Sequence, residues 1–197
     1  LLAAGLNDGT VRIFELEEGR HYNLTNNHLA AVTDLVFSPD GNQILTGSED
    51  CTVSQWDLVD RYRIQNVTPN KVDPFRISAI DWSSHTPSRF FCGNFEGIIV
   101  SDQSMENQDI FLTSDGIFYD LEISPDGKFL GITGTSSWIL PILSSEQPED
   151  PQPLDSGQPS EGRALAFTPD GAVLIIATRQ DLQFWSTADA ALIGSVP

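Results

Sequence analysis

A histidine, a serine and an aspartate stand near one another in the first third of the chain: His28, Ser48 and Asp50. These are the residue types of a hydrolytic triad, in which the imidazole removes the serine proton and the carboxylate orients the imidazole. The Gly-x-Ser-x-Gly elbow that often presents a nucleophilic serine is missing from the sequence. We therefore predict no catalytic residue and a structural role for these side chains.

Residues that could bind a metal or a phosphate are scattered. His21, His28 and His85 share no ligand spacing, and Cys51 and Cys92 lie far apart. Neither an EF-hand run of aspartates nor a glycine-rich phosphate loop is present. The sequence therefore predicts no metal and no cofactor.

Two cysteines in strand-like stretches do not form a disulfide framework, and small buried thiols are the simpler interpretation. This favours a reducing compartment, so we expect a cytoplasmic, or at least intracellular, protein. The sequons at Asn23 and Asn66 would matter only in a secreted protein.

The formal net charge is −18. A surface of this sign repels phosphate, so nucleic acid is not expected as a partner. The acidity fits simple solubility, and it also fits a partner with a basic surface or a basic peptide. No apolar run approaches the ~18 residues of a membrane span, so no membrane association is expected.

The elements that position these side chains repeat along the chain. One set of anchors comprises Phe37, Trp82, Ile123 and Phe167, at intervals of 45, 41 and 44 residues. A second set keeps a similar period and comprises Phe14, Trp56, Ser101, Ile142 and Trp185. A period near 43 is the length of a four-stranded propeller blade.

The turns between the expected strands have matching chemistry. Pro-Asp-Gly follows three anchors of the first set, Phe37, Ile123 and Phe167, at residues 39–41, 125–127 and 169–171. Proline presets φ, and glycine accepts the positive φ that such a turn requires. Alternating apolar residues flank the turns, and no segment has the length and periodicity of a helix. We predict an all-β protein of short antiparallel strands.

The segment 47–57, Gly-Ser-Glu-Asp-Cys-Thr-Val-Ser-Gln-Trp-Asp, resembles the strand–turn–strand ending of WD repeats, and residues 5–15 end similarly in Phe-Glu. The chain is thus similar to the WD-repeat β-propeller family. The resemblance implies a structural tetrad in which His28 bonds Asp50, with Thr46 or Ser48 leading to the Trp56 indole. In later blades the histidine position carries Asp73, Ser114 and Gln158, and the aspartate position carries Phe95, Ser136 and Arg179. We expect packing alone to hold those turns.

The repeat divides the chain into about five blades of four strands, counted a to d from the axis outwards. The expected ranges are 1–26, which lacks its inner strand a, and 27–68, 69–113, 114–159 and 160–197. Since such propellers usually close with seven blades, we expect this chain to be part of a larger propeller. Residues 144–162 are rich in proline and acidic residues and predict an exposed loop.

The resemblance implies a non-catalytic scaffold for protein–protein interaction, forming part of a larger protein. Two alternatives stay open: an enzyme on a propeller scaffold, such as a lactonase-like hydrolase, and a secreted ligand-binding propeller. Nothing in the sequence indicates an oligomeric state. Partner-binding rim residues are expected just before each inner strand and in the neighbouring b–c turns, namely at Ala31, Glu49, Arg76, Phe95, Ile117, Glu161 and Arg179.

Overall fold

The computed structural model describes residues 1–68, 76–83, 89–93, 97–102, 108–113, 117–142, 152–157 and 161–197. Within these ranges the chain consists of strands, turns and irregular segments, without a helix. The predicted all-β class is confirmed. Phe95, Asp73, Ser114 and Gln158 lie outside the described residues, as does most of the loop at 144–162.

The strands form five antiparallel sheets, and every sheet is a meander of consecutive strands. The first holds three strands, β1 (Leu2–Gly5), β2 (Val11–Glu15) and β3 (Arg20–Asn23). The second holds β4 (Val32–Phe37), β5 (Gln43–Ser48), β6 (Val53–Asp57) and β7 (Tyr62–Val67). The third holds β8 (Ala79–Trp82), β9 (Arg89–Gly93), β10 (Gly97–Asp102) and β11 (Gln108–Thr113).

The fourth sheet holds β12 (Phe118–Ile123), β13 (Phe129–Gly134), β14 (Trp138–Pro141) and the short β15 (Gln152–Pro153). The fifth holds β16 (Gly162–Phe167), β17 (Val173–Thr178), β18 (Leu182–Ser186) and β19 (Leu192–Val196). Blades of four antiparallel strands, predicted from the repeat period, are therefore confirmed for the second to fifth sheets.

The turns after the inner strands form as their residues predict. Gly41 and Gly127 have φ of 71°, in the left-handed region that favours glycine. Ser38 donates its hydroxyl to Asp40 at 2.5 Å, and Ser124 donates to Asp126 at 2.7 Å. Each serine also accepts a backbone N–H from the start of the next strand. The same polar closure therefore links strands a and b in different blades.

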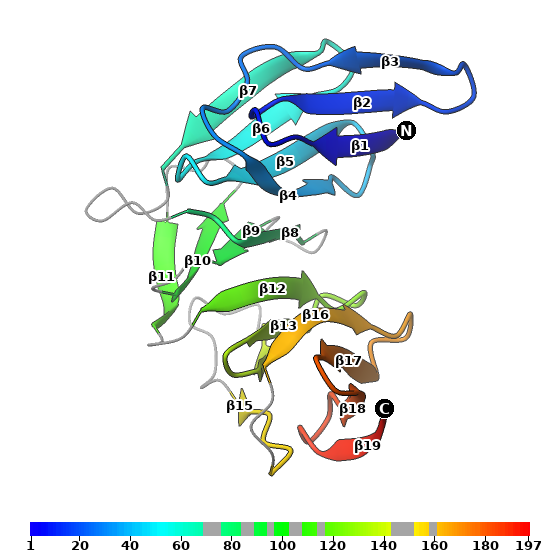
Figure 1. The fold of residues 1–197 in the computed structure, drawn as a ribbon. Helices are drawn as coiled ribbons and strands as arrows, with labels where there is room; N and C mark the ends of the chain where they lie inside the picture. The colour runs from blue at the N-terminus through cyan, green and yellow to red at the C-terminus, as the bar shows by residue number, and fades with distance from the viewer. Residues whose placement is uncertain are drawn as a thin grey trace.

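The core lies between successive blades. One cluster joins Val11 and Ile13 of the first sheet to Ile44 and Trp56 of the second, all fully buried. The later interfaces repeat this arrangement with apolar residues on facing strands. Each blade buries its faces against its neighbours. The sheets therefore follow one another in chain order along an arc, with the N-terminus at one end and the C-terminus at the other (Figure 1).

The inner strands β4, β8, β12 and β16 lie next to one another along this arc. Each of them is an edge strand of its own four-stranded sheet. The last blade carries its own outer strand, β19. The loops and turns at the ends of these strands carry the residues considered next.

Candidate functional site

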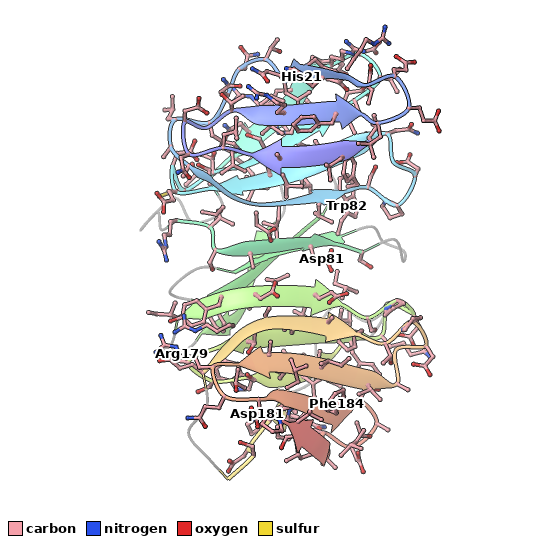
Figure 2. The ribbon with its side chains drawn as sticks, turned by 45° about the vertical axis from the view of Figure 1, so that its right-hand side comes forward. His21, Asp81, Trp82, Arg179, Asp181 and Phe184 are labelled. Atoms are coloured by element: carbon pink, nitrogen blue, oxygen red, sulfur yellow. The ribbon has the colours of Figure 1, made fainter. Side chains whose placement is uncertain are left out.

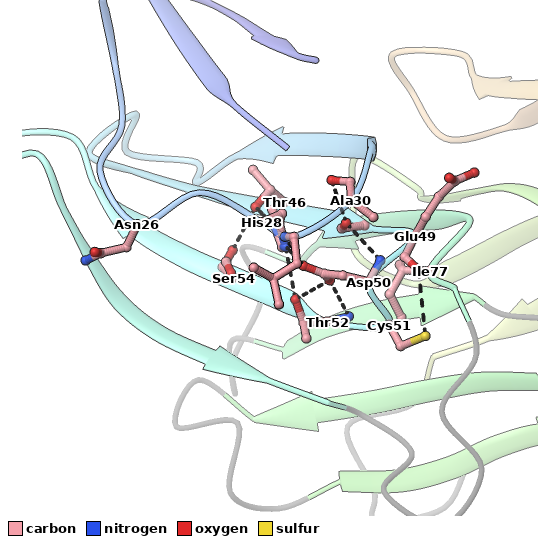
Figure 3. A network of polar contacts seen from close by, with 12 residues as sticks. Asn26, His28, Ala30, Thr46, Glu49, Asp50, Cys51, Thr52, Ser54 and Ile77 are labelled. Carbon is pink, nitrogen blue, oxygen red and sulfur yellow. Dashed lines mark hydrogen bonds and ion pairs between the residues drawn. The ribbon is translucent and has the colours of Figure 1, made fainter. Parts of the chain in front are cut away.

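A buried polar network surrounds His28, in the loop between β3 and β4 (Figure 3). The His28 Nδ1 atom lies 3.0 Å from Asp50 Oδ2, and Nε2 lies 2.7 Å from Thr46 Oγ1. The Trp56 indole N–H donates to the same Thr46 oxygen at 2.9 Å. His28 is 3% exposed, and Thr46 and Trp56 are fully buried. The structure thus joins the loop to three segments of the second blade.

Asp50 is the junction between this network and the backbone. Its carboxylate accepts the Leu29 N–H at 2.8 Å, the Thr52 N–H at 3.0 Å and the Thr52 hydroxyl at 2.6 Å. Burial raises the pKa of Asp50, but hydrogen bonds from His28, Thr52 and Leu29 outweigh it and hold the pKa well below its usual range. Thr52 was missed in the sequence, although its place two residues after an aspartate in a turn is a recognisable signal.

Ser48, the alternative link proposed from the sequence, lies beside the network. Its hydroxyl donates to the Ala30 carbonyl oxygen at 3.2 Å and accepts the Asp50 N–H at 3.1 Å. Thr46, and not Ser48, connects His28 to Trp56. Because both His28 nitrogens are engaged elsewhere, His28 does not act as a base on this serine. The arrangement fixes backbone; it is not set up for nucleophilic chemistry.

The network fixes the loop at His28, and the residue that follows His28 is exposed to solvent. Leu29 is 94% exposed, the largest exposure among the large apolar residues of the described chain. Its backbone N–H is fixed by Asp50, while its side chain has no apolar cover. Because the backbone that carries this apolar side chain is fixed, a partner that contacts it has less loop-ordering entropy to offset. It was not among the rim residues predicted from the sequence.

Three predicted rim residues form one group beside this loop. The Glu49 N–H donates to the Ala31 carbonyl oxygen at 2.9 Å, and the Glu49 carboxylate lies 3.4 Å from the Arg76 guanidinium. The two charged side chains are 44–45% exposed. The pair spans the boundary between the second and third blades, so this part of the rim combines a charged bridge with the exposed Leu29.

A second rim group lies on the fourth and fifth blades. The Glu161 carboxylate accepts from Arg163 at 2.7 Å and lies 3.7 Å from the Arg179 guanidinium. Arg163 also lies over the Tyr119 ring at 4.4 Å. Arg179 is the more exposed arginine and stands at the edge of the last blade (Figure 2). Ile117 is half-buried, and its carbonyl oxygen accepts the Thr135 N–H at 3.0 Å.

The later turns differ from the expectation that packing alone would hold them. In the fifth blade the Thr178 hydroxyl lies 2.6 Å from Asp181 Oδ1 and accepts the N–H groups of residues 180 and 181 at 3.0 Å. In the fourth blade the Thr133 and Ser137 hydroxyls lie 2.8 Å apart. Polar residues one to three positions from the expected ones supply these bonds, which is why position-by-position matching missed them. Cys51, expected in a strand, lies in a turn with φ of 70°.

A set of acidic residues on the inner strands was also missed. Asp34, Asp81, Asp120 and Glu122 are half-buried in β4, β8 and β12. Burial is the main cause that raises the pKa of Asp34 and Asp81 to about 6 and that of Glu122 to about 7. The available sequence signal was an acidic residue within an otherwise apolar strand.

The described residues contain no group of three or more His, Cys, Asp or Glu side chains able to hold a metal ion. Among the same residues no helix has the length and apolar character needed to cross a bilayer.

Comparison with known proteins agrees with this architecture. Residues 20–57 match the family model described as "WD domain, G-beta repeat", and this segment contains the whole of the His28 network. The matched repeat and the four-stranded blades define a WD-repeat β-propeller fold. The chain is similar to WD-repeat proteins, in agreement with the pattern in its sequence, and the family model itself matches one repeat.

Several WD-repeat relatives cover all or part of the chain. Periodic tryptophan protein 2 of Arabidopsis thaliana is 24% identical over 100% of the chain, which spans 22% of that protein. Apoptotic protease-activating factor 1 of Rattus norvegicus is 26% identical over 98% of the chain and 15% of its own length. WD repeat and SOCS box-containing protein 1 of Homo sapiens is 43% identical over 30% of the chain and 14% of its length. The chain therefore spans less than a quarter of each of these relatives.

Proposed function

We propose that this chain is a non-catalytic platform for protein–protein interaction, and that the rim around the loop between β3 and β4 is its binding surface. The observation that carries the proposal is the pairing of a buried network with an exposed anchor. Asp50 fixes the Leu29 backbone at 2.8 Å, and the Leu29 side chain is 94% exposed. A pre-positioned apolar side chain binds a partner without the entropy cost of ordering a loop.

The charge of the chain supports a partner with a basic surface. The formal net charge of −18 attracts cationic proteins and repels nucleic acid. The Glu49–Arg76 pair beside Leu29 gives the rim both charge signs next to an apolar anchor. We expect the partner to present an apolar pocket for Leu29 with basic groups around it.

WD-repeat proteins generally act as non-enzymatic scaffolds, and the fold matched here is theirs. The placement of the Ser48 hydroxyl away from His28 supports the same role for this chain. We further propose that the chain works inside the cell as part of a longer protein. Its coverage of less than a quarter of its relatives supports the second point.

The proposal is tested by comparing two substitutions on opposite loops of the second blade. Leu29→Asp changes the proposed anchor, and Val59→Asp changes an exposed valine, 71% exposed, in the turn between β6 and β7. Both variants gain one negative charge in place of an exposed apolar side chain. Quantitative crosslinking and mass spectrometry in cells should show partners that Leu29→Asp loses and that the wild-type chain and Val59→Asp retain. Identical partner sets for all three chains would contradict a binding role for this rim.

A further inference from the structure

The inner strands leave backbone amides that their own sheets cannot satisfy. Each of β4, β8, β12 and β16 pairs on one side only, with β5, β9, β13 and β17. The N–H groups on the other side point away from the sheet, and such unpaired edges need water or a side chain as a partner. For β8, β12 and β16, acidic side chains of the preceding blade supply this partner.

The first two contacts join the second, third and fourth blades. Asp34 Oδ2 on β4 accepts the Ile80 N–H of β8 at 2.8 Å. Asp81 Oδ2 on β8 accepts the Ile123 N–H of β12 at 2.6 Å. The remaining oxygen of each carboxylate accepts the N–H of the residue that follows it, at 2.7–2.8 Å. Each aspartate thereby joins its own strand to the next inner strand.

The fourth and fifth blades are joined twice. Asp120 Oδ2 on β12 accepts the Leu165 N–H of β16 at 2.9 Å, and the Phe167 backbone N–H faces the Glu122 carboxylate and lowers its pKa. Side chains two residues apart on a strand point to the same face, so Asp120 and Glu122 both face β16.

One positional rule describes all four contacts. Asp34 and Asp120 stand three residues before their anchors Phe37 and Ile123, and each bonds the amide two residues before the next anchor. Asp81 and Glu122 stand directly before their anchors, and each faces the amide of the next anchor itself. In β16 the two positions hold Ala164 and Ala166, which are exposed.

Most of the charged side chains around each of these four carboxylates are the other carboxylates of the same set. The strands β1, β5 and β13, which pack beside β4 and β12, contain no charged residue. On β16, Arg163 is engaged with Glu161 and Tyr119, and on β9 the Arg89 side chain lies outside the described side chains. Asp81 and Glu122 line one hollow of about 270 Å³, together with Trp82 (Figure 2 shows Asp81 and Trp82).

We propose that these inner-strand carboxylates are proton-sensitive clasps, which tie the second to the fifth blade in succession and hold this part of the arc more firmly as the pH falls from 8 towards 5. The inference concerns the coupling between blades and does not depend on the rim or its partner.

The direction in which stability changes with pH follows from the ionisation of the clasps. Burial first, and then the charges of the other clasps, raise the pKa of Asp34 and Asp81 to about 6 and of Glu122 to about 7. In the unfolded chain these groups titrate near 3.8 for Asp and 4.5 for Glu. The folded chain therefore binds more protons between about pH 4 and 7, and its stability declines as the pH rises through that window. A protonated clasp still has an oxygen that accepts the neighbouring amide, so neutralisation removes repulsion and keeps the bond.

The test compares melting midpoints between pH 5 and 8 for residues 1–197 and its variants. The double variant Asp81→Asn/Glu122→Gln keeps acceptor oxygens and removes both charges. It should raise the midpoint at pH 8 by about 2–4 °C or more and flatten the pH dependence. Glu17→Gln removes one charge at an exposed position and should follow the wild-type slope. An unchanged slope in the double variant, or a wild-type midpoint that rises with pH, would overturn the proposal.

Hydrogen exchange tests the contact itself. Asp81→Ala removes the acceptor of the Ile123 N–H, whereas Asp81→Asn retains an oxygen at that place. At one pH, exchange in the peptide that contains Ile123 should accelerate several-fold in Asp81→Ala and stay near the wild-type rate in Asp81→Asn. Equal exchange in both variants would show that Asp81 does not clasp the next blade. If Asp81→Ala does not fold, the charge-neutral Asn and Gln variants still decide the pH dependence.

Discussion

The Leu29 amide donates to Asp50 Oδ2 at 2.8 Å, while the Leu29 side chain is 94% exposed. A single carboxylate thus joins the buried imidazole of His28 to the most exposed large apolar side chain of the described chain. The buried polar network of the second blade and its rim are therefore not independent. A change inside the network is expected to alter how the rim loop is presented.

His28→Ala should destabilise the chain by about 2–4 kcal/mol, because it opens a cavity and leaves Asp50 and Thr46 without their buried partner. Urea denaturation followed by tryptophan fluorescence measures this loss. His21→Ala is the matched control, since His21 is exposed on β3 and should change stability by less than about 0.5 kcal/mol (Figure 2). Similar losses for the two histidines would argue against a structural network at His28.

Asp50 should control the acid limb of the stability profile. Its pKa is held below the unfolded value of 3.8, so its contribution is present above that pH and is lost as the pH falls through and below 3.8. This sign is opposite to that of the inner-strand carboxylates. Asp50→Asn should lower the unfolding free energy at pH 6 and flatten its decline between pH 5 and 2.5. Denaturation midpoints across this range measure the effect, and a decline as steep as that of the wild-type chain would refute the assignment.

The fold was accessible from the sequence through the period of its anchors, and the His28 network was expected from the resemblance to WD repeats. The anchors recur near every 43 residues, and His28, Thr46, Asp50 and Trp56 stand at repeat positions in a single blade. The sequence left open whether Thr46 or Ser48 links His28 to Trp56, since both precede the turn on one strand. Only the geometry shows which hydroxyl faces the imidazole.

The clasps were not accessible because they connect different sheets. Asp34 meets Ile80, and Asp120 meets Leu165, across more than forty residues of sequence. Asp34 and Asp120 share one repeat position, and Asp81 and Glu122 share a second one two residues further along. Each position is therefore acidic in only two of the four inner strands, which hides the pattern in the sequence. Leu29 was missed for another reason: an apolar residue beside a buried histidine gives no sequence signal for exposure.

Gly9 should be intolerant of substitution, because its backbone approaches the loop that carries His28. It has φ of 83°, and a Cβ added there would collide with the His28 carbonyl oxygen. Gly41 provides the control, with φ of 71° and no atom within 4 Å of an added Cβ. Gly41→Ala should cost about 1 kcal/mol from backbone strain, and Gly9→Ala about 3 kcal/mol or more. Thermal and urea unfolding of the two variants measure these costs. Equal losses of stability for Gly9→Ala and Gly41→Ala would contradict the close approach.

Trp185 in the fifth blade provides the sharpest comparison with the network of the second. It is 2% exposed, and its indole N–H lacks a hydrogen-bond partner among the described residues. Trp56, at the equivalent position, donates to Thr46, whose place in the fifth blade is taken by Ile176. An unpaired buried donor costs about 1–3 kcal/mol, so a hydroxyl at position 176 should recover part of that cost.

Ile176→Thr and Ile176→Val separate this gain from the loss of packing. The two variants remove the same volume from the core, and only threonine offers an acceptor to the indole. A threonine placed in an apolar site normally destabilises more than valine does. Here we expect Ile176→Thr to be more stable than Ile176→Val by about 1 kcal/mol, measured by urea denaturation. Thr46→Val should likewise destabilise the chain, because it removes the acceptor that His28 and Trp56 share. If valine were better than threonine at position 176, the indole would not be short of a partner.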